Sequence, residues 1–369
     1  MFGKFQLGHV ELQNRIVMAP MTRARADRQG VVGDIHAEYY AQRASAGLII
    51  TEGTAPSKDG LGYARTPGIF TDQQIKGWRE VTDAVHREGG KIFLQIMHVG
   101  RIAHPLNQLP GARIIAPSAI AAKGHMYTDQ EGAKDFPVPQ EMTKEDIRQV
   151  IAEYAQATRN ADIAGFDGVE LHAANGYLPN QFLSSSSNQR TDDYGGSAAN
   201  RVRFVVELVD AMAAAWSPDR VGVRVSPGST FNDMFDAEPL ETHVTLAREL
   251  SRRGLAYLHV LRSEPFAPAE KAFDALAVLK KEFNGTLIAN NNLDATEGEE
   301  LIKSGAAELV SFGRPFIANP DFVERVRHGW PLSEADGSTF YTPGVKGFTD
   351  YRPYAPKPVV PARALAQTA

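Results

Sequence analysis

The chain has 369 residues, 43% of them hydrophobic, and a formal net charge of -5. A chain of this length can bury a large core in one domain, and its acidic balance with scattered Lys and Arg argues against nucleic-acid partners. The lack of cysteine excludes disulfides, iron–sulfur clusters, thiolate zinc sites and cysteine nucleophiles. No signal-peptide core and no apolar stretch of ~18 residues is present, so we expect a cytoplasmic protein without a membrane segment.

The N-terminal third predicts a hairpin followed by strands that end in polar residues. Residues 5–12 alternate apolar and polar around Gly8 and His9, which favours a short β-hairpin. Apolar runs then predict strands at residues 16–19, 47–53 and 91–98. Each of these strands contains polar side chains or is followed by them.

The next strand begins near Phe166 in the stretch FDGVELHAANGY. It has Glu170 and His172 on one face and apolar residues on the other, which is typical of a strand buried on both sides. His172, Asn175 and Tyr177 follow within six positions at its end, and such a cluster indicates a site. Further strands are predicted at residues 221–226, 257–261, 287–290 and 309–312.

Helix signals fall between these strands. Thr71 and Thr143 are each followed three positions later by a residue that can complete a capping box. The last helix is expected to start at Asn319 with Pro320 in its first turn. Eight strand–helix units in sequence favour a single α/β domain, a (β/α)8 TIM barrel over residues 1–369, although an open doubly wound sheet stays an alternative.

One connection is unusually long for a barrel. Residues 99–142 follow the third strand of the barrel and are rich in Pro, Gly and Ala, with no helical stripe. Because loops of this length are usually functional or disordered, we expect a lid over the catalytic mouth. Residues 330–369 are expected to form a C-terminal extension.

Barrel active sites lie at the C-terminal ends of the strands. Neutral donors and one arginine collect there, without metal-ligand spacing or a Ser-His-Asp arrangement. Such a set suits a flat, polar organic cofactor better than a metal ion.

The sequence also resembles the Old Yellow Enzyme family of flavin-dependent ene-reductases. The segments that carry the resemblance are NRIVMAPMTR, YYAQRASAGLIITEG, QIMHVGR, HAANGYLPNQFLSSSSNQRTDDYGG, VGVRVSP, SFGRPFIANPD and GFTDY. The resemblance implies a barrel that carries noncovalent FMN and reduces the C=C bond of α,β-unsaturated carbonyl or nitro compounds. It implies NAD(P)H as the hydride donor, ping-pong kinetics, and a monomer or homodimer.

The resemblance also assigns cofactor-binding residues. It places Gln95 at the flavin pyrimidine edge, Arg224 near N1 and the C2 carbonyl, and Thr22 at the C4 carbonyl; some branches have cysteine instead of this threonine. A permanent positive charge near N1 would raise the flavin potential. Pro20 and Gly53 are also placed at the cofactor. The phosphate is expected after strands seven and eight, at Asn291, Asn292, Gly313 and Arg314, with an asparagine run where a glycine-containing turn is expected.

For the substrate, the resemblance implies that His172 and Asn175 polarise the carbonyl or nitro group and that Tyr177 protonates the α carbon. Tyr63, Met97 and Tyr341 are expected to line the substrate space, with Met97 where many relatives have tryptophan.

Other interpretations stay open from the sequence. His172 could be a core histidine, Asn175 an Asx turn, Tyr177 a packing residue bonded to a backbone carbonyl, and Arg224 a partner of Glu170. A flavin-free lyase or isomerase and a ligand-binding barrel without catalysis are the alternative functions.

Overall fold

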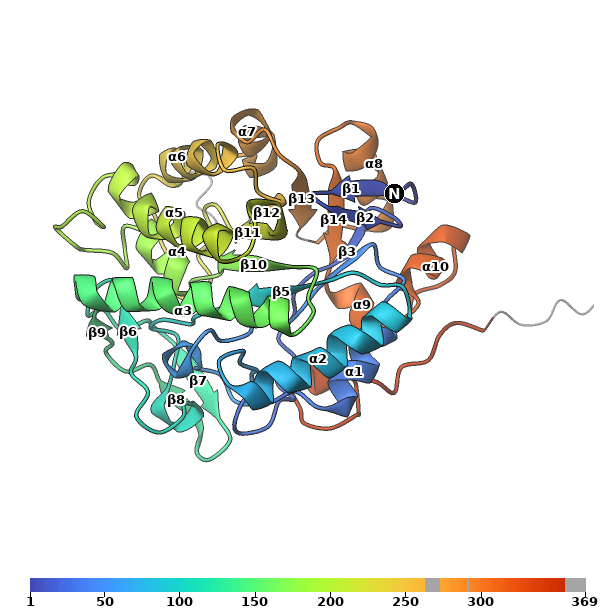
Figure 1. Ribbon diagram of the computed structural model, residues 1–369, viewed down its shortest axis with the longest axis horizontal. Helices are drawn as coiled ribbons and strands as arrows, with labels where there is room; N and C mark the ends of the chain where they lie inside the picture. Colours follow the sequence, from blue (N-terminus) through green and yellow to red (C-terminus); the bar gives the residue numbers. More distant parts are fainter. Residues whose placement is uncertain (263–272, 291, 356–369) are drawn as a thin grey trace, which may run out of the picture.

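The computed structural model describes residues 1–262, 273–290 and 292–355, and its centre is a closed barrel of parallel strands (Figure 1). Each strand pairs in parallel with the next around the barrel, and β14 closes it against β3. The barrel strands are β3 (Ile16–Met18), β4 (Leu48–Ile50), β5 (Ile92–Ile96), β10 (Gly168–Ala173), β11 (Val221–Val225), β12 (Tyr257–Leu261), β13 (Leu287–Asn290) and β14 (Leu309–Phe312). The predicted (β/α)8 barrel is confirmed, and the alternative prediction of an open doubly wound sheet is wrong.

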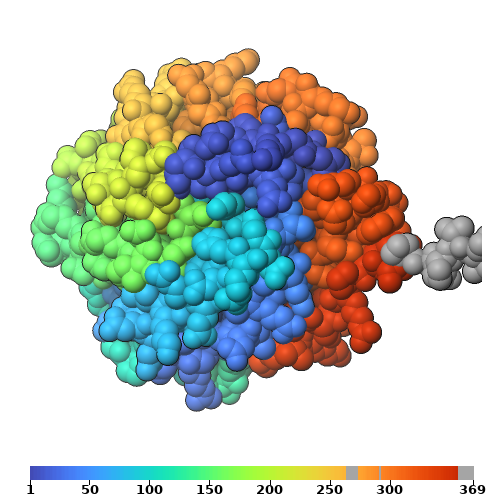
Figure 2. Space-filling model, turned by 45° about the vertical axis from the view of Figure 1, so that its right-hand side comes forward, coloured from blue at the N-terminus to red at the C-terminus, as the bar shows by residue number. Residues whose placement is uncertain are grey.

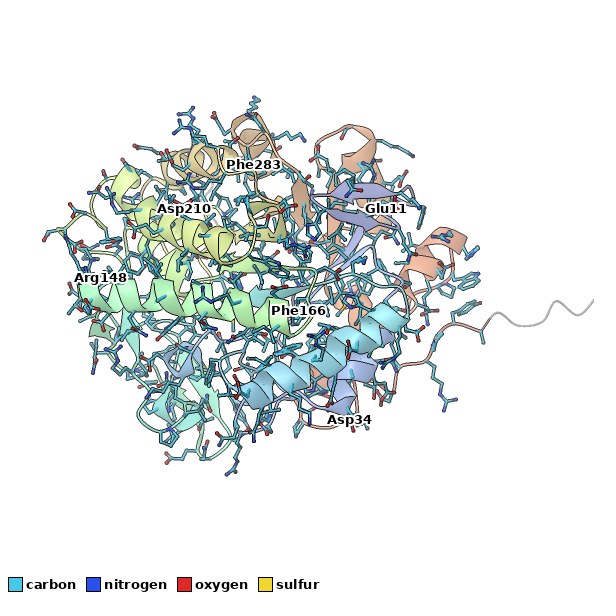
Figure 3. All side chains as sticks on the ribbon, viewed as in Figure 1. Glu11, Asp34, Arg148, Phe166, Asp210 and Phe283 are labelled. Carbon is cyan, nitrogen blue, oxygen red and sulfur yellow. The ribbon has the colours of Figure 1, made fainter. Side chains whose placement is uncertain are left out.

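Helices follow the strands and cover the outside of the barrel (Figure 1). They are α1 (Asp34–Ala41), α2 (Asp72–Arg87), α3 (Lys144–Ile163), α4 (Leu178–Leu183), α5 (Ala198–Ala215), α6 (Pro239–Ser251), α7 (Ala275–Glu282), α8 (Ala295–Lys303), α9 (Arg314–Ala318) and α10 (Phe322–His328). Their outer faces carry exposed charges such as Arg148 and Asp210, whereas Phe283 and Phe166 are buried (Figure 3). The main core therefore lies between the sheet and the helices.

Two helix starts agree with the sequence signals, and the last one does not. Thr71 and Thr143 each accept a hydrogen bond from the backbone N–H three positions on, and both capping boxes are complete. The last helix is present, but its predicted start at Asn319 is wrong: the backbone of Asn319 is not helical, and its side chain bonds to the carbonyls of Pro315 and Ser333. Asn319 therefore ends α9, and α10 begins at Phe322 after Pro320.

The predicted N-terminal hairpin is present, and it closes one end of the barrel. Strands β1 (Phe5–Leu7) and β2 (Val10–Leu12) are antiparallel, and their buried leucines pack with Val17, Phe93 and Tyr257 in one apolar cluster. Gly222 is required here because a Cβ at that position would lie 2.2 Å from the Tyr257 ring. Figure 2 shows the N-terminal segment (dark blue) lying across the molecule between early and late parts of the chain. Polar side chains that point into the barrel therefore lie toward the opposite end.

The long connection after β5 contains small sheets. Strands β6 (Ile115–Ala116) and β9 (Gln140–Glu141) are parallel, and β7 (His125–Thr128) and β8 (Gly132–Asp135) form an antiparallel hairpin. The connection also bonds to the barrel loops, since Arg101 donates to the Asp233 carbonyl at 2.7 Å. Its position in the sequence is as predicted, and its action as a lid stays a prediction.

The C-terminal residues up to 355 pack beside the end of β3. Arg23 Nη2 donates to the Gly347 carbonyl at 2.8 Å, and Arg25 Nη2 donates to the Thr339 carbonyl at 2.9 Å. These bonds hold Phe340 and Tyr341 near the mouth of the barrel. Residues 356–369 of the predicted extension lie outside the described residues. In the described part of the chain, no helix is both long and apolar enough to cross a membrane.

Candidate active site

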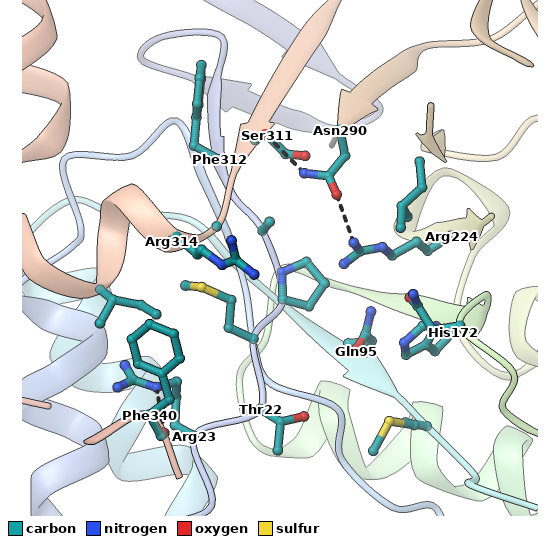
Figure 4. A pocket seen from close by; sticks show the side chains of 18 of the residues that line it. Thr22, Arg23, Gln95, His172, Arg224, Asn290, Ser311, Phe312, Arg314 and Phe340 are labelled. Atoms are coloured by element: carbon teal, nitrogen blue, oxygen red, sulfur yellow. Dashed lines mark hydrogen bonds between the residues drawn. The ribbon is translucent and has the colours of Figure 1, made fainter. Parts of the chain in front are cut away.

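The C-terminal ends of the barrel strands enclose a cavity of about 430 Å³ (Figure 4). Its volume lies in the range of small-molecule sites, and it occupies the end of the barrel where such enzymes act. Most of the residues selected from the sequence line it: Pro20, Thr22, Gln95, Met97, His172, Asn175, Tyr177, Arg224, Asn292, Gly313, Arg314 and Tyr341. Within the described residues, no group of three or more His, Asp or Glu could hold a metal ion.

One side of the cavity is a connected set of side chains, Gln95, Arg224, Asn290 and Ser311, which we call the networked wall. Arg224 Nη2 donates to Asn290 Oδ1 at 2.9 Å, and Asn290 Nδ2 donates to the Ser311 carbonyl at 3.1 Å (Figure 4). The sequence had left open a pair between Arg224 and Glu170, but no hydrogen bond joins these two residues. Glu170 instead accepts from Gln95 at 2.7 Å.

Arg224 has a further donor with no partner. Its Nε is buried and makes no hydrogen bond to any residue that the structure describes. Burial lowers the pKa of Arg224, while the Glu170 charge opposes that shift. Because a guanidinium remains protonated in proteins and a buried orphan donor is costly, this position suits an acceptor atom of a bound ligand. The observation fits the pyrimidine edge of FMN.

Next to the networked wall, His172, Asn175 and Tyr177 form a second part of the lining, which we call the donor wall, with His172 beside Arg224 in the barrel register. His172 Nδ1 accepts from the Ala174 N–H at 3.4 Å, so a neutral ring carries its proton on Nε2. Burial, followed by the charges of Arg224 and His259, lowers the pKa of His172 well below its ordinary value. His172 is therefore a neutral donor at physiological pH.

Asn175 stands at the turn that ends this strand. Its backbone is left-handed, with φ of 56°, and is held by a bond from its N–H to Ser226 Oγ at 2.9 Å. An Asx turn at Asn175 would need the Tyr177 N–H, which bonds instead to the Ala174 carbonyl at 3.3 Å, so the Asx turn that the sequence left open does not explain Asn175. In the part of the chain described, the Asn175 side-chain amide has no hydrogen-bond partner and stays available to a ligand.

Tyr177 lies beside His172, with ring centroids 4.9 Å apart, and its hydroxyl is 3.1 Å from the Tyr63 hydroxyl. It bonds to this phenol rather than to a backbone carbonyl. Burial, then the neighbouring Tyr63, raises the pKa of Tyr177 well above its ordinary value. Tyr177 therefore keeps its proton at neutral pH.

The third part of the cavity lies after β13 and β14. Gly313 and Arg314 begin α9, and the exposed Arg314 side chain has no hydrogen-bond partner among the described residues. Asn292 has φ of 48°, which agrees with the expectation that asparagine tolerates a left-handed turn here. Asn291 lies outside the described residues.

Two selected residues do not line this cavity. Gly53 lies behind Met97, because a Cβ on Gly53 would be 2.5 Å from the Met97 sulfur. Its missing side chain makes room for Met97, and its contact with the cofactor stays a prediction. Tyr63 lines an adjoining cavity of about 1110 Å³ that extends under residues 123–136 and shares Thr22, Tyr177 and Tyr341 with the first.

Several lining residues were not given a role from the sequence. Asn290 and Ser311 complete the networked wall, and Phe231 borders both cavities. Asn290 and Ser311 lie near the ends of β13 and β14 and point into the barrel, and this position was the sequence signal that could have identified them. Phe231 lies in the loop after β11, which carried no pattern.

The family model described as "NADH:flavin oxidoreductase / NADH oxidase family" matches residues 1–333. A probable flavin mononucleotide-dependent alkene reductase of Leishmania infantum is 45% identical, and the match covers 94% of this chain and 95% of the relative.

Solved structures agree with these sequence matches. Morphinone reductase in complex with tetrahydroNAD is 44% identical with a TM-score of 0.90, and the match covers 96% of this chain and 97% of that one. An old yellow enzyme homologue from Zymomonas mobilis is 38% identical with a TM-score of 0.92, over 95% and 99% of the two chains. The chain therefore belongs to the NADH:flavin oxidoreductase / NADH oxidase family, the FMN-dependent oxidoreductases to which old yellow enzyme homologues belong.

Proposed function

We propose that this protein is an ene-reductase that reduces the C=C bond of α,β-unsaturated carbonyl or nitro compounds with NAD(P)H in a ping-pong cycle. The observation that carries the proposal is the donor wall: a neutral His172 Nε2–H, a free Asn175 amide and the Tyr177 phenol line the same cavity as Arg224. The Leishmania relative is named an alkene reductase, which supports the same reaction class.

The networked wall would hold the flavin ring. Gln95 and Arg224 offer hydrogen bonds to its pyrimidine edge, and Thr22 offers a hydroxyl from the end of β3. Gly313, Arg314 and Asn292, with Asn291, would receive the phosphate, because backbone amides and a guanidinium suit a phosphate group. When bound and reduced by a nicotinamide, FMN supplies the hydride for the alkene.

The donor wall would act on the substrate. His172 Nε2–H and the Asn175 amide would donate to the carbonyl or nitro oxygen and stabilise the negative charge that develops there. Tyr177 would transfer its hydroxyl proton to the α carbon, and Tyr63 would stabilise the phenolate that remains. The nicotinamide and the alkene would use this wall in turn, which gives the ping-pong order.

The adjoining cavity would give access to the site. Tyr63 and Tyr341 line it, while Met97 lies in the wall of the inner cavity. Residues 99–142 would act as a lid over this opening. The flexible thioether of Met97 would shape the substrate range without taking part in the chemistry. We further propose a cytoplasmic monomer or homodimer.

The test begins with the purified protein. We expect bound flavin by absorbance, or its recovery on adding FMN, followed by anaerobic bleaching with NADH or NADPH. Reoxidation by a panel of enones, maleimides and nitroalkenes should then restore the oxidised spectrum. A protein that takes up no FMN would favour a flavin-free lyase, isomerase or binding protein, and bleaching without reoxidation by any alkene would refute the substrate class.

A further inference from the structure

A buried carboxylate that contacts no cavity lies directly behind the networked wall. Glu170 on β10 is 0% exposed, and its two oxygens have different partners. One accepts from Gln95 Nε2 at 2.7 Å, and the other lies 2.9 Å from His259 Nδ1. His259 Nε2 in turn lies 2.8 Å from Ser311 Oγ. The chain of bonds thus leaves the cavity at Gln95 and returns to it at Ser311.

The protonation states follow from the contacts. Burial alone would raise the pKa of Glu170, but the charge and hydrogen bond of His259, the Arg224 charge and the Gln95 bond together hold it below its ordinary value. Burial lowers the pKa of His259, against the opposing effect of Glu170. At neutral pH Glu170 is therefore an anion and His259 a neutral ring with its proton on Nδ1. Ser311 Oγ, which is closer to His259 than to the Ala289 carbonyl at 3.3 Å, donates to Nε2.

An anionic Glu170 determines how the Gln95 amide faces. A carboxylate only accepts hydrogen bonds, so the Gln95 amide must turn its nitrogen toward Glu170. The flipped amide would set two acceptor oxygens against each other. The Gln95 oxygen and its second N–H are therefore left in one orientation for a ligand in the cavity.

Glu170 also contributes a charge. Its neighbour in register on β11 is Gly222, whereas Arg224 is opposite His172, two residues later on β10. Glu170 thus lies one layer deeper in the barrel than Arg224. A negative charge there partly offsets the field of Arg224 at the cavity, and in a buried site such charges are weakly screened.

We propose that Glu170 is a positioning residue of the FMN site: it holds Gln95 in the orientation that binds the flavin and, by offsetting Arg224, lowers the flavin reduction potential. The inference rests on the proposed place of FMN against Gln95 and Arg224. It gives two separable effects, one on affinity through the hydrogen bond and one on potential through the charge.

Two substitutions separate these effects. Glu170→Gln removes the charge but can keep the geometry, because its oxygen accepts from Gln95 and its amide donates to Nδ1 of a His259 ring whose proton moves to Nε2. Glu170→Asp keeps the charge but withdraws the carboxylate from Gln95. Asp167→Asn is the matched control: Asp167 precedes the same strand and bonds to the Ile92 N–H at 2.9 Å, at the end of the barrel away from the cavity.

The measurements are the FMN dissociation constant and the reduction potential of the loaded protein, with circular dichroism to verify folding. In Glu170→Gln, the FMN dissociation constant should stay within about threefold of that of the unaltered protein. The equilibrium between oxidised and reduced FMN should shift about tenfold toward the reduced form, which is a rise in reduction potential of about 30 mV for a two-electron couple. Glu170→Asp should bind FMN about tenfold more weakly, the value of one hydrogen bond. Asp167→Asn should change neither quantity.

The outcomes are distinct. An unaltered protein that binds no FMN refutes the proposed function itself. If it binds FMN, an unchanged or lower potential in Glu170→Gln overturns the charge effect, and unchanged affinity in Glu170→Asp overturns the orientation effect. Equal shifts in Asp167→Asn would also overturn the proposal, because they would reflect a general loss of barrel packing. Should Glu170→Gln fail to fold, Glu170→Asp still tests the orientation.

Discussion

The two walls of the cavity differ in how their polar groups are satisfied. Arg224, Asn290, Ser311 and Gln95 are joined to one another or to the Glu170 layer behind them, whereas the Asn175 amide and the His172 Nε2–H have no partner among the described residues. Ordered bonds restrict a side chain to one rotamer, so the networked wall suits one resident ligand. The donor wall suits ligands that come and go.

The same difference appears in the electrostatics. The networked wall contains a buried cation, Arg224, and a buried anion, Glu170, lies behind it. The donor wall consists of neutral groups, and burial shifts the pKa values of His172 and Tyr177 away from their charged forms. A charged wall can tune a redox group, and a neutral wall can bind uncharged enones without an unpaired ion. The following predictions test whether the walls separate cofactor from substrate.

The largest effect is expected at Tyr177. Tyr177→Phe removes the phenolic proton but keeps the ring against His172, so alkene reduction should slow by about 10² to 10⁴ while flavin bleaching by the nicotinamide stays nearly intact. Stopped-flow measurement of the two half-reactions checks this. Tyr63→Phe keeps the Tyr177 hydroxyl but removes the group that would stabilise its phenolate, so it should slow alkene reduction less than Tyr177→Phe does. Equal slowing of both half-reactions in Tyr177→Phe would contradict a role as proton donor.

A smaller effect that reaches both half-reactions is expected at Asn175. Loss of one donor to the developing oxyanion should slow alkene reduction by about 10² to 10³. Because the nicotinamide would use the same wall, its binding should weaken by about tenfold, as for one lost hydrogen bond. Asn175→Ala tests both the rate of alkene reduction and the binding of the nicotinamide. Because alanine adopts the left-handed backbone of Asn175 less readily, thermal melting should verify that the variant is folded. Unaltered nicotinamide binding would mean that the two ligands do not share the donor wall.

On the networked wall, Arg224→Ala should weaken FMN binding by about 10- to 100-fold, since hydrogen bonds to charged groups contribute about 1.5 to 3 kcal/mol. It should also lower the potential of the FMN that remains, because a positive charge near the reduced ring is lost. Arg224→Lys keeps the charge and loses the planar fork, so its potential should fall less. Full FMN occupancy with an unchanged potential in Arg224→Ala would refute the assignment.

The strands and the long helices could be predicted from the sequence because their signals are local. Periodic apolar residues and the caps at Thr71 and Thr143 act within a few positions. The small sheets in residues 99–142 were not predicted, since β6 and β9 have two residues each and pair across 25 positions of chain. Residues after strand ends could be selected as candidates by the same local logic.

The connections behind the site could not be predicted. Glu170 contacts Gln95 across 75 positions and His259 across 89, and which inward side chains meet depends on the barrel register. The sequence left a pair between Arg224 and Glu170 open as an alternative, whereas the structure gives Arg224 a hydrogen bond to Asn290. The sequence also could not show that the missing side chain of Gly53 makes room for Met97.

The smallest expected effect concerns a second buried carboxyl, Glu52, which accepts from the Arg23 N–H beside Thr22 at 3.1 Å. Burial raises the pKa of Glu52 from 4.5 to about 7. A raised pKa means that the folded state binds the proton more tightly, so the stabilisation is complete below pH 4.5 and disappears as the pH rises through 7. The free energy of unfolding should therefore fall by roughly 1 kcal/mol from this group between pH 6 and pH 8. Denaturant titrations of Glu52→Gln should lack this loss. The same pH dependence in both proteins would contradict the raised pKa of Glu52.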